Sequence, residues 1–163
     1  MGALSIVLLS DVVAADMPVP GKVQGAIFKK IFGYDKQLRD KQELVVLVVG
    51  GSRDEQATQE IVTAFVGDGV SPAVADIESL AAPISDAVVY LMPDADVELA
   101  RKYCTDHGVL SISGVPTFAE QGWVSVGLDI DGDRPQIVVN LQRLAAEGHS
   151  FSAEILRVSS VVR

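Results

Sequence analysis

The chain has 163 residues, a net charge of −9 and a mean hydropathy of +0.32. This length and hydrophobicity predict one folded domain and exclude a disordered chain. The 13 basic residues are scattered, which excludes nucleic acid as a partner, because phosphate binding requires a dense Lys/Arg surface.

The segment 1–15 begins the chain with a short apolar run, Leu4–Val13, followed by the small residues Ala14-Ala15. This arrangement is typical of a signal peptide, although no Lys or Arg precedes the run and Asp11 interrupts it. The alternative is an N-terminal helix or strand that packs on the domain. The run is shorter than the about 20 apolar residues that span a bilayer. We therefore expect no membrane insertion of the mature chain and a single domain over 16–163.

The first half of the domain alternates helix and strand patterns. Lys22–Phe32 has its apolar residues on one helical face. Leu44–Val49 is continuously apolar and predicts a strand buried on both faces. Ser52–Glu55 has the spacing of a capping box, which predicts the start of the next helix. Val70–Ile77 predicts an edge strand, because Pro72 cannot donate to a neighbouring strand.

The same alternation continues toward the middle of the chain. Leu80–Ile84 predicts a weak helical turn, and Ala95–Thr105 a helix. Asp86–Met92 and Val109–Ser113 predict two more buried strands. Strands and helices at this pitch imply right-handed crossovers and a mainly parallel sheet. The predicted fold class is α/β, a three-layer sandwich with a flavodoxin-like core and helices on both faces.

A β-hairpin is expected near the C-terminus. Trp123–Ile130 and Gln136–Leu141 alternate apolar and polar residues, and Asp131-Gly132-Asp133 between them favours a tight turn. We expect these strands to be antiparallel and to lie at the edge of the sheet.

Two helical patterns follow the hairpin. Asn140 is expected to cap the first helix, which Gly148 ends. A last amphipathic helix is expected to start near Ser150 or Ser152 and to include the apolar residues up to Val162.

Short motifs in this C-terminal region carry a family resemblance. They are Phe118-Ala119-Glu120-Gln121-Gly122, Val138-Val139-Asn140-Leu141, Ala145, Gly148, and Phe151-Ser152-Ala153-Glu154-Ile155-Leu156-Arg157-Val158. The region resembles the YfiR/HmsC-like family of periplasmic proteins, whose pattern has a Phe-Ala-x-x-Gly-Gly turn, a Glu-Ile-Asn strand end and a Ser-x-x-Leu-Leu helix. Trp123 and Val138 depart from the usual Gly and Glu. The motif residues are interpreted as structural: Phe118, Gly122, Asn140, Ser152 and Leu156.

The resemblance implies a non-catalytic, periplasmic regulator. Its partner would be the extracytoplasmic domain of a membrane-bound diguanylate cyclase or another sensor protein, and homodimer formation is also expected. Trp123 is either a core residue or an exposed contact for a partner, since Trp is common among interface anchors.

A small-ligand sensor or carrier is the alternative function. The turn Gly50-Gly51-Ser52-Arg53 follows a predicted strand, where open α/β sheets place ligands, and its N–H groups with Arg53 suit an anion. We expect Gly114 and Thr117 to complete this cleft. The competing interpretation of the turn is a plain loop with a helix cap.

No catalytic residue, metal site or cofactor is predicted. Cys104 and His107 stand close together, but two ligands make a poor zinc site and a nucleophile needs an oriented base. His107 and His149 each precede or follow a glycine at a helix end, where a structural role is favoured. The hairpin aspartates 129, 131 and 133 lack the bidentate Glu of a calcium loop.

Overall fold

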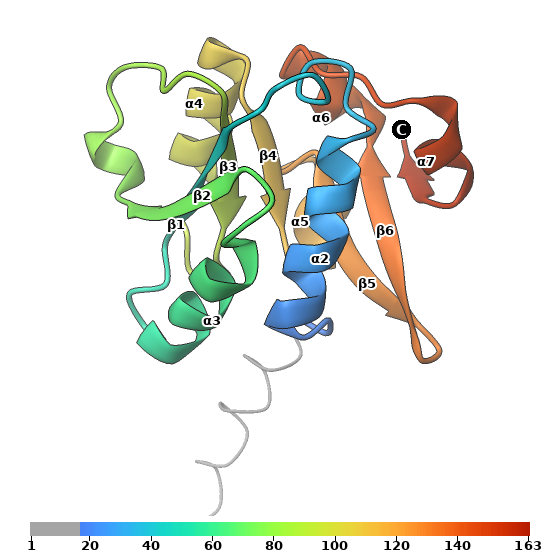
Figure 1. Cartoon of the computed structure of the whole chain (residues 1–163), viewed down its shortest axis with the longest axis horizontal. Helices are drawn as coiled ribbons and strands as arrows, with labels where there is room; N and C mark the ends of the chain where they lie inside the picture. Colours follow the sequence, from blue (N-terminus) through green and yellow to red (C-terminus); the bar gives the residue numbers. More distant parts are fainter. Residues whose placement is uncertain (1–16) are drawn as a thin grey trace, which may run out of the picture.

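A seven-stranded sheet forms the centre of the computed structural model, which describes residues 17–163 (Figure 1). The expected signal peptide, residues 1–15, lies outside the described residues. The strands are β1 Leu44–Val49, β2 Val70–Ala75, β3 Ala87–Leu91, β4 Leu110–Ser113, β5 Val126–Asp131, β6 Arg134–Asn140 and β7 Ser160–Val162.

The sheet is mainly parallel, as the sequence predicted. Its order is β2-β1-β3-β4-β5-β6-β7. Strands β1 to β5 are parallel, and their order 2-1-3-4-5 is that of flavodoxin-like proteins. β6 returns antiparallel to β5 through a two-residue turn, and Gly132 in this turn has a φ of +66°. Strand β7 then pairs in parallel with β6.

Helices cover both faces of this sheet, which confirms the three-layer sandwich (Figure 1). One face packs against α2 and α3, and the other against α4 and α5. None of the helices in the described range is long and apolar enough to cross a bilayer. The helices are α2 Gly21–Phe32, α3 Glu55–Phe65, the 3-10 helix η1 Ile77–Ser79, α4 Val97–His107, α5 Pro116–Glu120, α6 Leu141–Ala146 and α7 Ala153–Arg157.

Alternation along the central strands divides the core between the two faces. In β1, Val46 and Val48 belong to the layer beneath α2 and α3, whereas Leu47 and Val49 belong to the layer beneath α4 and α5. This division follows from the period of two along a strand. It explains why β1 is apolar at every position and is predicted well from sequence alone.

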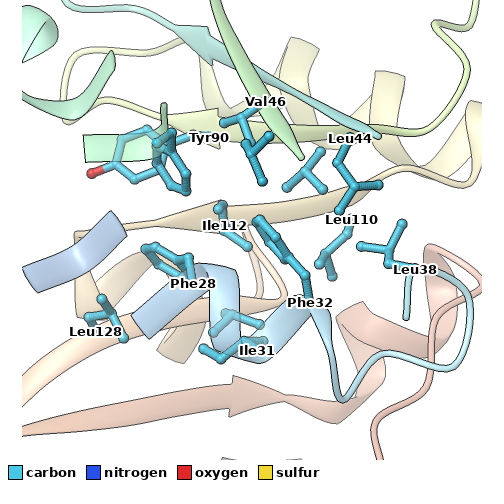
Figure 2. Packing of buried hydrophobic residues seen from close by; sticks show 14 of the residues in the cluster. Phe28, Ile31, Phe32, Leu38, Leu44, Val46, Tyr90, Leu110, Ile112 and Leu128 are labelled. Atoms are coloured by element: carbon cyan, nitrogen blue, oxygen red, sulfur yellow. The ribbon is translucent and has the colours of Figure 1, made fainter. Parts of the chain in front are cut away.

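Aromatic rings fill the layer beneath α2 and α3. Figure 2 shows Phe28 and Phe32 of α2 facing Tyr90 and Ile112 of the sheet. The Phe28 and Tyr90 rings meet edge to face with centroids 6.1 Å apart, and Phe65 of α3 stacks beside them. Such aromatic pairs stabilise a core by about 0.5–1.5 kcal/mol beyond the burial of area.

Two predicted helix signals in the first half are wrong. The N-cap of α3 is Asp54, whose carboxylate accepts the N–H of Ala57, so Ser52–Glu55 is not a capping box. The Ser52 hydroxyl is instead bonded to Asp94. The weak helical turn expected at Leu80–Ile84 is irregular, because the short helix of this connection lies earlier, at η1.

Two predictions near the C-terminus also need correction. The hairpin does not form the edge of the sheet, because β7 covers β6. The last amphipathic segment is not one helix: α7 ends at Arg157, and Ser160–Val162 is a strand. Ser152 is the N-cap of α7, but its hydroxyl makes no capping bond.

Candidate functional site

The loop after β1 is fastened by Asp94, which follows β3. Because β1 and β3 are adjacent parallel strands, the loops after them meet at the carboxyl edge of the sheet. Asp94 accepts the Gly51 N–H at 2.5 Å, the Ser52 hydroxyl at 3.0 Å and the Arg53 N–H at 3.3 Å. Burial raises the pKa of Asp94, but these three hydrogen bonds outweigh it and hold the pKa below its usual 3.8. The N–H groups expected to receive an anion are therefore bonded to a carboxylate of this chain.

The two glycines of this loop are required by its geometry. Gly50 and Gly51 have φ values of +86° and +82°, in the left-handed region that other residues rarely adopt. A Cβ on Gly51 would overlap the hydroxyl of Thr58, which bonds to the Gly51 carbonyl at 3.2 Å. The loop is thus packed directly on the first turns of α3.

An open hollow of about 810 Å³ lies beside this loop, between α3, η1 and the start of α4. Gly50, Gly51 and Ser52 form part of its wall. The described residues that line it include five carboxylates and no Lys or Arg: Glu55, Asp76, Glu78, Asp94 and Asp96. Clustered carboxylates attract cations and repel anions. A neutral or cationic molecule therefore fits this hollow better than the anion suggested by the sequence.

The other residues of the predicted cleft lie elsewhere. Arg53 lines a separate small pocket with Met92 and Pro93. Gly114 follows β4 and packs against the side chain of Gln24, and Thr117 is exposed on α5. Strand β3 separates β4 from β1, so the two halves expected to form one cleft do not line the same hollow.

The family-motif residues build a corner where α5 meets β5 and β6. Phe118 is buried, and its ring lies 5.4 Å from that of the half-buried Trp123. Gly122 has a φ of +74°, which permits the tight turn after α5. Asn140 caps α6 by accepting the Arg143 N–H at 2.9 Å, as predicted, and its amide group donates to the Ala119 carbonyl at 2.9 Å.

The remaining motif residues lie at the C-terminal helix. Leu156 packs half-buried against the core beneath α2 and α3. The Ser152 hydroxyl is buried without a hydrogen-bond partner among the described residues. Trp123 is neither fully buried nor fully exposed, so its contact with a partner stays a prediction.

A buried charge that was not predicted from the sequence lies at the end of α6. Glu147 accepts the Ser111 N–H at 2.9 Å, the Ser111 hydroxyl at 2.6 Å, the Ser125 hydroxyl at 2.5 Å and the Arg143 Nε–H at 2.9 Å. Arg143 also donates to Thr105 of α4 at 2.5 Å. Burial raises the pKa of Glu147, and the serines and Arg143 oppose that rise. The spacing of Arg143 and Glu147, four residues apart, was the available signal.

A second buried pair joins distant segments. His149 Nδ1 lies 2.7 Å from Asp35 Oδ2, and His149 Nε2 lies 2.9 Å from the Gly108 carbonyl oxygen. Both side chains are at most 4% exposed. His149 was expected to have a structural role at a helix end. Its side chain contacts Asp35, which no local pattern in the sequence indicated.

These polar groups form no reactive constellation. Cys104 is buried, and burial raises the pKa of its thiol well above the usual 9.0. His107 stacks on Tyr103, with ring centroids 4.7 Å apart. Within residues 17–163 no three His, Cys, Asp or Glu side chains are grouped as metal ligands. The described residues offer surfaces and open hollows for binding, among them the one beside Gly50 and Gly51 and a larger one of about 1130 Å³ between α2 and α3.

A comparison with known protein families finds one family that matches most of the chain. Residues 22–160 match the YfiR/HmsC-like family, a range that contains strands β1 to β6, helices α3 to α7 and nearly all of α2. The chain belongs to the YfiR/HmsC-like family. That family is periplasmic and regulatory. No curated protein matches the chain.

Proposed function

We propose that this protein is a non-catalytic periplasmic regulator that binds the extracytoplasmic domain of a membrane-bound diguanylate cyclase and restrains its activity. The observation that carries this proposal is the family match over 22–160. A regulator of this kind acts by binding one conformation of its partner more tightly than another and so shifting their populations.

The arrangement of polar groups supports binding over catalysis. The buried charges of Glu147, Arg143 and Asp35 are bonded to other groups of the chain. The thiol of Cys104 is enclosed in the core between the sheet and α4. The buried Cys104 thiol and Glu147 carboxylate are therefore not placed to act as a nucleophile or acid on a substrate in a cleft.

The test begins with cyclic di-GMP in cells. Deleting the gene should raise cellular cyclic di-GMP, measured by mass spectrometry, and a plasmid copy should restore the original level. The cyclase whose additional deletion abolishes the rise is then the partner. Its purified periplasmic domain should bind the purified mature protein in calorimetry, whereas the periplasmic domain of a second cyclase from the same strain should not. An unchanged cyclic di-GMP level after deletion contradicts the proposal.

The periplasmic location has its own test. N-terminal sequencing of the protein from the periplasmic fraction should begin after the apolar run 4–13. An intact Met1 in the cytoplasmic fraction contradicts export.

The hollow beside Gly50 and Gly51 supports a second candidate function, a periplasmic small-ligand sensor or carrier. Its five carboxylates favour a neutral or cationic molecule. A rise in melting temperature of the purified protein with a small cationic compound such as spermidine, lost in Glu78→Gln, supports this alternative.

A further inference from the structure

The C-terminal segment 149–163 is attached to the rest of the domain at a joint near its start and again where β7 pairs with β6. It carries α7 and the edge strand β7. Its first residues pair with the loop between α2 and β1: the Lys36 N–H donates to the Ser150 carbonyl at 2.9 Å, and the Ser152 N–H donates to the Tyr34 carbonyl at 3.0 Å. Beyond the joint, most side chains of α7 and β7 are exposed or half-buried, and Ile155 is the buried one.

His149 stands at the centre of this joint and contacts three segments. Its own backbone N–H donates to the Leu144 carbonyl at 3.0 Å, which ties it to α6. Its ring lies between Asp35, on the loop after α2, and the carbonyl of Gly108, at the end of α4. The second oxygen of Asp35 accepts the Gln37 N–H at 2.8 Å, which fixes the carboxylate in place.

The two ring contacts favour the charged form of the His149 ring. Asp35 Oδ2 and the Gly108 carbonyl oxygen are both acceptors, so each contact requires an N–H on the ring. Neutral imidazole has one N–H and imidazolium has two. The geometry therefore fits a positively charged His149 that donates to both oxygens.

We propose that His149 is a pH-sensitive clamp that, in its charged form, fastens the segment 149–163 to the loop after α2 and to α4, and that releases this hold as the pH rises. Histidine is suited to such a switch because its charge changes near neutral pH. Loss of the proton removes one of the two hydrogen bonds and leaves the Asp35 carboxylate buried without its counter-charge.

The charged groups around the ring favour the charged form. Burial lowers the pKa of His149, but the hydrogen bond and charge of Asp35, the Gly108 carbonyl and the Glu147 carboxylate outweigh it, so the pKa lies above the usual 6.5. Arg143 on α6 is bonded to Glu147. On α4, Asp106 pairs with Lys102 and His107 stacks on Tyr103.

The raised pKa of His149 sets the direction in which the strength of the clamp changes with pH. Because the folded pKa exceeds that of a solvated histidine, the clamp stabilises the joint fully below about pH 6.5 and is lost as the pH rises through the folded pKa. The equilibrium constant for opening the joint should then rise by one factor of ten for each unit by which the folded pKa exceeds about 6.5. The midpoint of the His149 titration therefore predicts how much the exchange of the amides at the joint accelerates with pH.

The test is an NMR titration combined with hydrogen exchange on the mature protein. The chain has only two histidines, so His107→Gln leaves the ring signal of His149 alone. Its midpoint should lie above 6.5, and Asp35→Asn should lower it by roughly one to three pH units. Exchange of the Lys36 and Ser152 amides, corrected for intrinsic rates, should accelerate with pH by the factor that the midpoint predicts.

His149→Gln should abolish this pH dependence, whereas the matched variant His107→Gln should retain it. The titration of the wild-type ring needs no substitution at the joint, so it decides the question even if Asp35→Asn does not fold. A midpoint at or below 6.5, or the same pH profile in wild type and His149→Gln, overturns the proposal.

Discussion

At the scale of single residues, Glu147 shows how a buried charge is accommodated. Four donor groups surround its carboxylate, and Arg143 supplies the balancing charge. The same Arg143 bonds to α4, so the pair connects α6, β4 and α4. Removing the carboxylate leaves the guanidinium group and the serine hydroxyls buried with missing partners.

We therefore expect Glu147→Ala to lower the free energy of unfolding by about 3–5 kcal/mol, the usual cost of removing one partner of a buried ion pair. Urea unfolding followed by circular dichroism measures this loss. The control is Glu43→Ala, because Glu43 is exposed on the loop before β1. Equal midpoints for the two variants would show that the network contributes no net stability.

Asp94 gives a second prediction at this scale. Its folded pKa lies below 3.8, so its bonds to the Gly51 loop contribute stability that is present above pH 3.8 and is lost as the pH falls through the folded pKa. Asp94→Asn should therefore be less stable than wild type at pH 7, and the difference should shrink as the pH is lowered toward 3. Unfolding curves at several pH values measure the difference. A gap that stays constant down to pH 3 contradicts this role.

At the scale of elements, the contact between α2 and α3 depends on a glycine. Gly25 lies in the middle of α2, and a Cβ there would overlap the backbone carbonyl of Ala64 in α3. Helix propensity favours Ala over Gly by about 1 kcal/mol. Contact with a backbone atom opposes this preference, because the carbonyl cannot move aside without shifting α3.

Gly25→Ala should therefore destabilise the protein by about 1–3 kcal/mol, the usual cost of overpacking a close contact. Gly21→Ala, in the first turn of the same helix, is the control, since its Cβ would meet Ile61 at an ordinary 3.4 Å. Chemical denaturation compares the two variants. If Gly25→Ala is more stable than wild type, helix propensity outweighs the contact and the close approach is not required.

The helices and strands also differ in how well the local sequence pattern predicts them. Leu44–Val49 was predicted with its observed bounds, because a strand buried on both faces is apolar throughout. Strand β7 was missed because its three residues continue the apolar pattern of α7, and pairing with β6 decides their conformation. The cap of α3 was misassigned because Ser52 and Asp54 both suit that position, and the tertiary contact with Asp94 occupies Ser52.

The candidate sites were less predictable for a related reason. Gly50 and Gly51 were identified because a turn after a buried strand has a local pattern. Asp94 lies 43 residues from Gly51 in sequence, and His149 lies 114 residues from Asp35. Contacts at such separation depend on the strand order, which composition and periodicity do not specify.

At the scale of the whole molecule, each layer of the sandwich is filled by its own core cluster, and the buried charges lie where segments join. Glu147 joins α6 to β4 and to Ser125 just before β5, and His149 joins the C-terminal segment to the loop after α2 and to the end of α4. These groups maintain the shape of the surface. A protein that acts by binding depends on that shape and needs no reactive side chain.

Cys104→Ala tests this view of the molecule. Cys104 is the one thiol of the chain, and it is buried between α4 and the sheet. Replacing it with Ala should cost about 1 kcal/mol of stability, since one buried atom beyond Cβ is lost. In the gene-deletion strain, the variant should lower cyclic di-GMP as far as the wild-type protein does. Failure to do so, with equal amounts of both proteins in the periplasm, would indicate thiol chemistry and contradict a function based on binding alone.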